Sequence, residues 1–315
     1  MPRITIAIVI ALHAAIAFAV EPPEERFQSM KWPGDPSQGQ PDYLYRLYIP
    51  EGSSYGLRPL LVWFHGHKER GEDNIKNLRW MELLFGAVND SPPMYILVPQ
   101  HHSNEDWSSE EDSNTDALAV TLQIIDQVSA KFPIDPDRVY LAGVSSGGNA
   151  CLTLAFRHPD RFAAIAPMGS GGGSLSWAST FRRIPIWLFH SYDDTATNPD
   201  GDRALIAALQ KAGGIAALTE TEWKPNRSSN HDCWTAAFQD YNVLDWLLAQ
   251  RRGEAVQWYP GPTVRQSTWI WFRHNGWLIV AWSGIVLVLR YSWKKMKTSI
   301  ISADTKSFDG STKEI

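Results

Sequence analysis

One serine in this chain stands in a setting that is typical of a catalytic nucleophile. Ser145 lies between Gly143 and Gly147, after the apolar run 138–144 and before a helical pattern at 146–157. A serine hydroxyl is exposed for attack when it sits on a sharp turn between a strand and a helix, where flanking glycines relieve crowding. Ser146 does not fit such a turn, because Val144 stands where glycine would be needed. The alternative to a nucleophile at Ser145 is an ordinary glycine-rich turn.

The order of residues along the chain restricts the partners of this serine. In hydrolases that present serine in this way, the acid and then the histidine follow the nucleophile in sequence. Four histidines follow Ser145: His158, His190, His231 and His274. The first two precede or adjoin the carboxylates that follow the apolar run 184–189, and His274 lies beside an apolar C-terminal segment. His231 therefore remains as the base, with Asp193 and Asp194 both open as the acid that orients its imidazole.

The backbone amides that would stabilise an oxyanion are expected at His67 and Ser146. An upstream apolar strand ends in His65-Gly66-His67. In this arrangement the loop after that strand donates one N–H, and the residue after the nucleophile donates the other. Bound metal at these histidines and at His101-His102 is an alternative, but no carboxylate–histidine motif of the metalloenzyme type accompanies them. We therefore expect neither a metal ion nor an organic cofactor.

The elements around these residues predict an α/β fold. Strand-like runs alternate with helical ones, which is typical of a mainly parallel sheet with helices on both faces. The expected strands are 43–49, 59–65, 94–98, 138–144, 162–167, 184–189 and 217–223. The expected helices are 115–132, 146–157, 202–212 and 235–250.

Both ends of the chain carry apolar segments. Arg3 precedes the largely apolar run 4–20, and Ala17-Phe18-Ala19 fits a signal-peptidase site; an uncleaved N-terminal anchor is the alternative. Near the C-terminus, the uncharged run 277–289 is short for a membrane span, but tryptophans flank it and Lys294, Lys295 and Lys297 follow it. An anchor is therefore favoured over an interfacial or packed helix.

These segments divide the chain as follows. We expect a signal peptide at 1–19, an N-terminal lead at 20–42, a catalytic domain at 43–250, a linker at 251–268, a transmembrane anchor at 269–293 and a polar tail at 294–315. The net charge of −5 does not suggest a nucleic-acid partner. The two cysteines, Cys151 and Cys233, are too few for a disulfide framework, and either pairing or two free thiols would fit.

Several segments together resemble a known group of enzymes. They are HGHKERGED, PDRVYLAGVSSGGNACLTLAFRHPDRFAAIAPMGSGG, LFHSYDD and NHDCWTAAF, within residues 43–251. They resemble the secreted esterase/peptidase-like branch of the α/β-hydrolases, which includes polyhydroxybutyrate-depolymerase-like and feruloyl-esterase-like enzymes. The resemblance implies Ser145 as nucleophile, His231 as base and Asp194 as acid, with Asp193 in reserve. It also implies Trp107 and Trp177 as candidates to line the acyl pocket, although either could equally be a packed tryptophan.

A further segment matches the region after the oxyanion loop of the same family. Arg70, Gly71 and Asp73 are expected to brace that loop, and a solvated charge run is the alternative.

The function expected from these residues is hydrolysis of a carboxylic ester by an exported, membrane-tethered serine enzyme. The substrate would be a small-molecule or polymer-borne ester, and an acyl-enzyme would form on Ser145. A serine peptidase with the same triad and a non-catalytic binding module of the same fold are the alternatives. The intact Ser-Asp-His set argues against the binding module.

Overall fold

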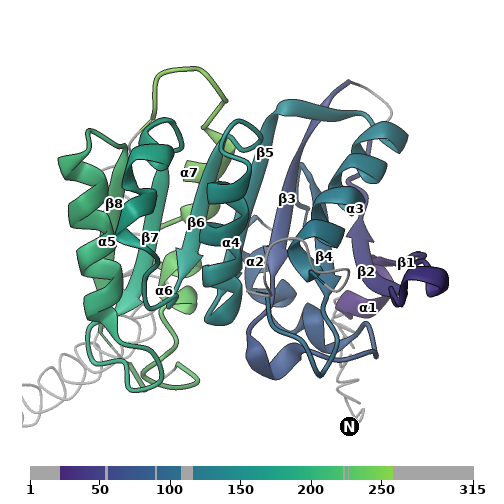
Figure 1. Cartoon of the computed structure of the whole chain (residues 1–315), viewed down its shortest axis with the longest axis horizontal. Coiled ribbons are helices and arrows are strands. Elements are labelled where there is room, and N and C mark those ends of the chain that lie inside the picture. Colours follow the sequence, from purple (N-terminus) through teal and green to yellow (C-terminus); the bar gives the residue numbers. More distant parts are fainter. Residues whose placement is uncertain are drawn as a thin grey trace, which may run out of the picture. The chain divides into compact units, whose positions relative to one another are not determined.

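An eight-stranded sheet is the framework of the described part of the chain (Figure 1). The computed structural model describes residues 22–257, apart from 54–55, 89–90, 108–115, 223 and 226. The strands lie in the order β1-β2-β4-β3-β5-β6-β7-β8. Their bounds are β1 (Gln28–Trp32), β2 (Tyr43–Tyr48), β3 (Arg58–Phe64), β4 (Tyr95–Gln100), β5 (Ile134–Val144), β6 (Ala164–Met168), β7 (Ile186–Ser191) and β8 (Ala216–Thr221).

The strand directions are those of an α/β-hydrolase. From β4 to β8 all neighbouring strands are parallel, whereas β1 pairs with β2, and β2 with β4, in antiparallel fashion. The central strands are mainly apolar because helices cover both faces of the sheet. In β3, for example, all residues from Pro59 to Phe64 are buried. The expected α/β-hydrolase fold is confirmed.

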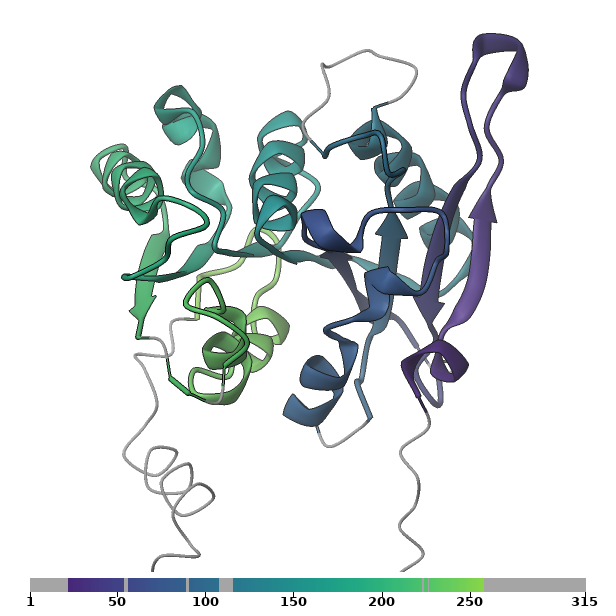
Figure 2. The same ribbon diagram turned by 90° about the horizontal axis from the view of Figure 1, so that it is seen from below.

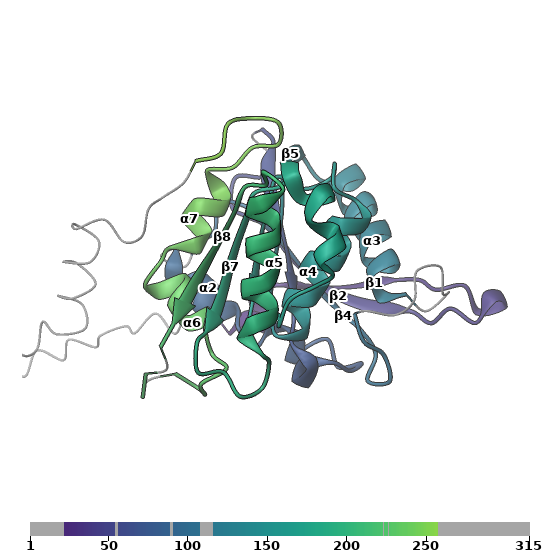
Figure 3. The same ribbon diagram turned by 60° about the vertical axis from the view of Figure 1, so that its left-hand side comes forward.

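Helices form a layer on each face of the sheet (Figure 2). One layer contains α3 (Ala117–Lys131), α4 (Ser146–Arg157) and α5 (Pro199–Lys211), and the other contains α2 (Met81–Ala87), α6 (Trp234–Gln239) and α7 (Val243–Leu248). Figure 3 shows α4 and α5 lying along the strands in front of the sheet. The shorter helices are α1 (Pro23–Arg26), η1 (Pro36–Gln38), η2 (His67–Glu69), η3 (Lys76–Leu78) and η4 (Leu175–Arg183).

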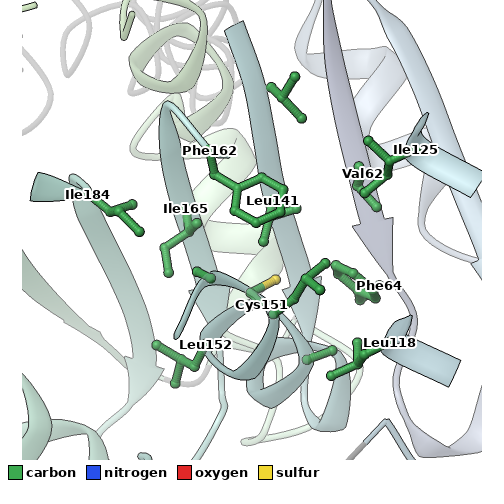
Figure 4. Packing of buried hydrophobic residues seen from close by; sticks show 14 of the residues in the cluster. Val62, Phe64, Leu118, Ile125, Leu141, Cys151, Leu152, Phe162, Ile165 and Ile184 are labelled. Carbon is green, nitrogen blue, oxygen red and sulfur yellow. The ribbon is translucent and has the colours of Figure 1, made fainter. Parts of the chain in front are cut away.

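Each helix layer encloses its own hydrophobic core. In the core under α3 and α4, Cys151 and Leu152 of α4 pack with Leu141 of β5, Phe64 of β3 and Ile165 of β6 (Figure 4). All five side chains have 0% exposure. Burial of this kind stabilises α4 against the sheet, with about 1.5–3 kcal/mol for each large apolar side chain. The nucleophile candidate therefore precedes one of the most firmly packed helices of the fold.

The structure departs from the expected elements in several places, and α2 (Met81–Ala87) is a helix that the sequence patterns do not predict. The helix expected at 235–250 is two helices, α6 and α7, separated at Asn242, whose φ of 52° ends helical geometry. Asparagine tolerates this left-handed conformation better than most residues, and so the break occurs there. The strand β1 also lies within the expected lead 20–42, so the sheet begins before residue 43.

The terminal segments that were expected to direct export and membrane attachment lie outside the described residues. These are the signal peptide at 1–19, the anchor at 269–293, the tail at 294–315 and most of the linker at 251–268. Within the described residues no helix has the length and apolar character of a membrane span.

The two cysteines do not form a disulfide. Cys151 and Cys233 are both free and fully buried. They lie in the two different cores, on opposite faces of the sheet. The Cys233 thiol donates to the carbonyl of Phe189 at 3.3 Å.

Candidate active site

Ser145 occupies a strained turn between β5 and α4. Its φ of 56° and ψ of −123° lie outside the regions that residues with a side chain normally adopt. The backbone is held there because the Ser145 N–H donates to the carbonyl of Met168 at 2.7 Å, and α4 begins at the next residue. The Ser145 side chain makes no capping hydrogen bond to the helix, so its hydroxyl is not used to stabilise α4.

The glycines beside Ser145 permit a close approach of backbone segments. A Cβ at Gly143 would lie 2.4 Å from the carbonyl oxygen of Gly147, and one at Gly147 would lie 2.2 Å from the carbonyl oxygen of Phe64. Separations this short are not possible for real Cβ atoms. The two glycines of the sequence motif are therefore required to pack the turn against the end of β3.

His231 and Asp194 meet at the same end of the sheet. The Nδ1 of His231 lies 2.5 Å from Oδ2 of Asp194. Asp193 takes a different role, since its backbone carbonyl accepts from the Asn230 side chain at 2.6 Å, and its Oδ1 has no hydrogen-bond partner among the described residues. Of the two aspartates that the sequence left open, Asp194 is thus the one that contacts the histidine.

The environment of Asp194 favours its ionised form. Burial alone would raise the pKa of this carboxyl, but the hydrogen bonds from His231 and from the amides of Thr197 and Ala196 outweigh burial and lower the pKa. The two amides donate to Oδ1 at 3.1 and 2.7 Å. Asp194 is therefore fixed in orientation, and its Oδ2 can accept a hydrogen bond from the Nδ1–H of His231.

The other ring nitrogen of His231 is unused. His231 Nε2 is buried and has no hydrogen-bond partner among the described residues. The ring packs against the backbone of Gly169, where a Cβ would lie 3.0 Å from Cε1 of His231. With Nδ1 held by Asp194, Nε2 can take a proton from a nucleophile or give one to a leaving group.

A pocket of ≈ 400 Å³ contains both Ser145 and His231. It is also lined by His67, and Ser146 follows Ser145 as the first residue of α4. Within the described part of the chain, the N–H groups of His67 and Ser146 make no backbone hydrogen bond. Both amides are thus available to an oxyanion, and Ser146 adds the partial positive charge of the helix N-terminus.

The loop that carries His67 is braced by polar contacts. Asp73 Oδ1 accepts from the amides of Ile75 and Lys76, each at 2.9 Å. Gln100 donates to the carbonyl of Glu69 at 2.9 Å, and the Gly71 N–H donates to the carbonyl of His101 at 3.0 Å. Gly71 and Asp73 therefore belong to an ordered loop rather than to a solvated charge run, and Arg70 contacts the ring of His67.

The two tryptophans expected in the acyl pocket lie elsewhere. Trp107 is 2% exposed and donates to the carbonyl of His65 at 3.0 Å, so it packs beneath the oxyanion loop. Trp177 stacks on Phe156 of α4 with ring centroids 4.8 Å apart. Neither is among the residues that line the pocket of Ser145.

Two other tryptophans line that pocket instead. Trp80 and Trp234 meet edge to face at 5.1 Å, and Trp234 meets the His231 ring at 5.3 Å. An ion pair of Glu69 with Arg79, at 3.0 Å, completes this wall. Sequence patterns carry little signal for these residues. Trp80 directly precedes α2 and Trp234 begins α6, so the two tryptophans meet only when α2 and α6 pack side by side.

Two buried histidines lie below the oxyanion loop. His65 and His101 stack with ring centroids 4.8 Å apart, and Trp107 packs against both. Burial, with the neighbouring His101 as a smaller cause, lowers the pKa of His65 to about 3. Burial lowers the pKa of His101 to about 4. Both rings are therefore neutral at physiological pH and support the loop through packing.

Comparisons with known proteins show which proteins the chain resembles. Residues 43–177 match the family model described as Esterase PHB depolymerase. The chain is also 28% identical to a solved thermostable esterase, with a TM-score of 0.63 over 72% of this chain and 64% of the other. The chain has the α/β-hydrolase fold. The resemblance to polyhydroxybutyrate-depolymerase-like esterases that the sequence predicted is confirmed.

Curated relatives of this α/β-hydrolase are esterases and depolymerases. A bifunctional acetylxylan esterase/xylanase of Neocallimastix patriciarum is 28% identical over 67% of this chain and 30% of that protein. A poly(3-hydroxyalkanoate) depolymerase C of Paucimonas lemoignei is 30% identical over 39% of this chain and 30% of that protein. The chain thus spans about a third of the length of these two relatives. A solved ferulic acid esterase, 15% identical with a TM-score of 0.54, shares the fold.

Proposed function

We propose that this α/β-hydrolase cleaves carboxylic esters through an acyl-enzyme on Ser145. His231 is the general base, Asp194 orients and stabilises its ring, and the amides of His67 and Ser146 receive the oxyanion. No metal or organic cofactor takes part in these steps. The similarity of the chain to esterases supports hydrolysis as the reaction class.

The observation that carries this proposal is the strained backbone of Ser145 beside an oriented histidine. A φ of 56° at a residue with a side chain costs of order 1–3 kcal/mol. The fold bears that cost at a serine whose hydroxyl does not cap the adjoining helix and which shares a pocket with His231. Strain, an oriented base and free amides at one place are what acyl transfer requires.

The chemical steps follow from the arrangement of these groups. Ser145 Oγ attacks the ester carbonyl while His231 Nε2 takes its proton, and the ionised Asp194 stabilises the resulting imidazolium. The negative charge on the carbonyl oxygen moves toward the two amides. His231 then protonates the leaving alcohol, and water, activated by the same nitrogen, releases the acid and restores Ser145.

The pocket supports an ester whose acyl or alcohol part is at least partly apolar or aromatic. Trp80 and Trp234 offer flat apolar surface, while the Glu69–Arg79 pair leaves a polar site at the same wall. Acetylated or feruloylated polysaccharide and polyester oligomers would meet this description. The names of two relatives, a bifunctional acetylxylan esterase/xylanase and a poly(3-hydroxyalkanoate) depolymerase C, agree with this substrate class.

A substrate panel tests the proposal against the peptidase alternative. The purified protein should hydrolyse p-nitrophenyl acyl esters, and Ser145→Ala should abolish this, while Ser174→Ala, at an exposed serine, should not. Peptide p-nitroanilides should be cleaved at least a hundredfold more slowly. A faster reaction with the anilides would establish a peptidase, and equal activity of Ser145→Ala and wild type would contradict the catalytic assignment.

We further propose that the protein is exported and held at a membrane by its C-terminal segment. The support is sequence alone: the Ala17-Phe18-Ala19 site and the tryptophan- and lysine-flanked run 277–289. Truncation before Trp269 should move the protein from the membrane fraction to the soluble one. If the distribution does not change, the anchor is not there.

A further inference from the structure

A second buried histidine contacts the same oxygen of Asp194 as His231 does. His190, in β7, has 0% exposure, and its Nε2 lies 3.0 Å from Asp194 Oδ2. Its Nδ1 lies 2.5 Å from Oδ2 of Asp202, which is also fully buried. The chain of contacts therefore runs from His231 through Asp194 and His190 to Asp202.

The protonation state of His190 follows from its two partners. A neutral imidazole has one N–H and one lone pair, so one of its nitrogens would face a carboxylate without a proton between them. Only an imidazolium presents an N–H toward both carboxylates, because Nδ1 is hydrogen-bonded to Asp202 and Nε2 lies at ion-pair distance from Asp194. Burial opposes the charged ring, but the hydrogen bond and the charge of Asp202, with the charge of Asp194, outweigh it and raise the pKa of His190.

Asp202 has its own support at the start of α5. Its Oδ1 accepts from the Ser170 hydroxyl at 2.6 Å, and its Oδ2 accepts from the amide of Gly171 at 3.2 Å. The carboxylate also lies in the first turn of a 13-residue helix, where the helix dipole favours negative charge. Asp202 is therefore a fixed anion on one side of His190.

Other groups around His190 do not change this balance. The Thr197 hydroxyl lies 3.3 Å from Nε2. On α6, burial raises the pKa of the Cys233 thiol well above its usual value, so this group is neutral. On β8, Glu220 is the register partner of His190 and is paired with Arg203. Among the described residues, the cations that Asp194 and Asp202 contact are thus His190 and, when protonated, His231.

We propose that His190 is a positively charged positioning residue that holds the triad acid and keeps the enzyme active at lower pH. The inference rests on the proposed function of Ser145, Asp194 and His231. A positive charge on His190 repels a second proton on His231, because both rings share Asp194 Oδ2. His231 is then neutral, and able to act as a base, at more acidic pH than it would be beside an uncompensated aspartate.

The pH profile of kcat/KM tests this role. Asp202→Asn keeps the size of the side chain but removes the anion that charges His190. The midpoint of the acidic limb should move to higher pH by about one pH unit, which is the smallest shift expected from a neighbouring charge. His190→Gln should move it in the same direction. Asp200→Asn, at an exposed aspartate of the same helix turn, should leave it in place.

A spectroscopic measurement keeps the inference separate from catalysis. In ¹⁵N-histidine-labelled Ser145→Ala protein at neutral pH, one histidine that exchanges slowly with water should have both ring nitrogens protonated. This signal should disappear in the Asp202→Asn background. A neutral His190 ring, or an acidic limb that stays unmoved in a folded Asp202→Asn protein, would overturn the proposal. Wild-type protein without esterase activity would overturn the proposed function, while the labelled protein would still decide the charge of His190.

Discussion

Two pairs of histidines in this protein behave in opposite ways. His65 and His101, below the oxyanion loop, make no hydrogen bond to a carboxylate within the described residues, and burial lowers the pKa of each. His190 and His231, near the other side of Ser145's pocket, both contact Asp194, and the pKa of His190 is raised. Burial is similar for His65 and His190, at 0% exposure each. Contact with a carboxylate, rather than the degree of burial, therefore decides whether a buried ring stays neutral or carries a positive charge.

The largest expected effect is that of replacing Asp194, the carboxylate that both His190 and His231 contact. Asp194→Asn should lower kcat of ester hydrolysis by roughly 10⁴, because the amide no longer stabilises the imidazolium and favours the wrong tautomer. Asp193→Asn is the matched control and should stay within about tenfold of the wild type, because its side chain does not contact His231. If Asp193→Asn gave the larger loss, the acid would be misassigned.

The neutral histidines His65 and His101 should make the unfolding free energy fall in acid. The pKa values of His65 and His101 are about 3 and about 4 in the folded protein, below the unfolded value near 6.5. The unfolded chain therefore binds more protons below pH 6.5, and stability falls by about 1.4 kcal/mol per pH unit for each neutral ring as pH drops. His190 has the opposite sign, since its contribution is complete below pH 6.5 and is lost as pH rises through its raised pKa.

Urea unfolding between pH 7 and pH 4.5 measures this dependence. His101→Phe keeps an aromatic ring in the stack, but the new ring cannot be protonated. The slope of the unfolding free energy against pH should therefore decrease by up to the contribution of one proton, about 1.4 kcal/mol per pH unit. An unchanged slope in His101→Phe would mean that this ring is charged or accessible in the folded state.

A smaller effect separates packing from charge. Trp107→Phe removes the hydrogen bond to the carbonyl of His65 and should lower the unfolding free energy by about 1–3 kcal/mol, because a buried acceptor loses its partner. The acidic limb of the pH profile should not move, in contrast to the Asp202→Asn protein. A shift of that limb in Trp107→Phe would connect the two histidine pairs and remove the distinction between them.

The smallest expected effect concerns the backbone strain at Ser145. Glycine adopts positive φ freely, so Ser145→Gly should be more stable than Ser145→Ala by about 1 kcal/mol, after its larger entropy loss on folding is subtracted. Both variants should lack esterase activity. Equal stability of the two in urea unfolding would mean that the turn is not strained.

The sequence predicted the features that depend on local pattern. The strain-prone turn at Ser145 was evident because Gly143 and Gly147 must be small where the turn packs against β3. Seven of the strands were found because strands covered on both faces are almost wholly apolar. His231 followed from chain order, and the structure brings it to Asp194.

Features set by tertiary packing are harder to predict from residue patterns. Asp193 and Asp194 follow the same strand, so chain order alone leaves both open; the family resemblance favours Asp194, and the turn after β7 brings that side chain to His231. The pocket tryptophans Trp80 and Trp234 lie in segments far apart in the chain. For Trp107 the sequence leaves a pocket wall and a packed tryptophan open, and the structure has it packed. The short edge strand β1 was missed since three of its five residues are exposed and its apolar pattern is weak.

The central claim is that Ser145 is the nucleophile, and covalent labelling tests it most directly. The wild-type protein is treated with a fluorophosphonate, digested with trypsin and mapped by mass spectrometry. We expect one adduct, on Ser145 rather than on the adjacent Ser146, and no adduct in the Ser145→Ala protein. An adduct on another residue, or equal labelling of Ser145→Ala and wild type, would contradict it.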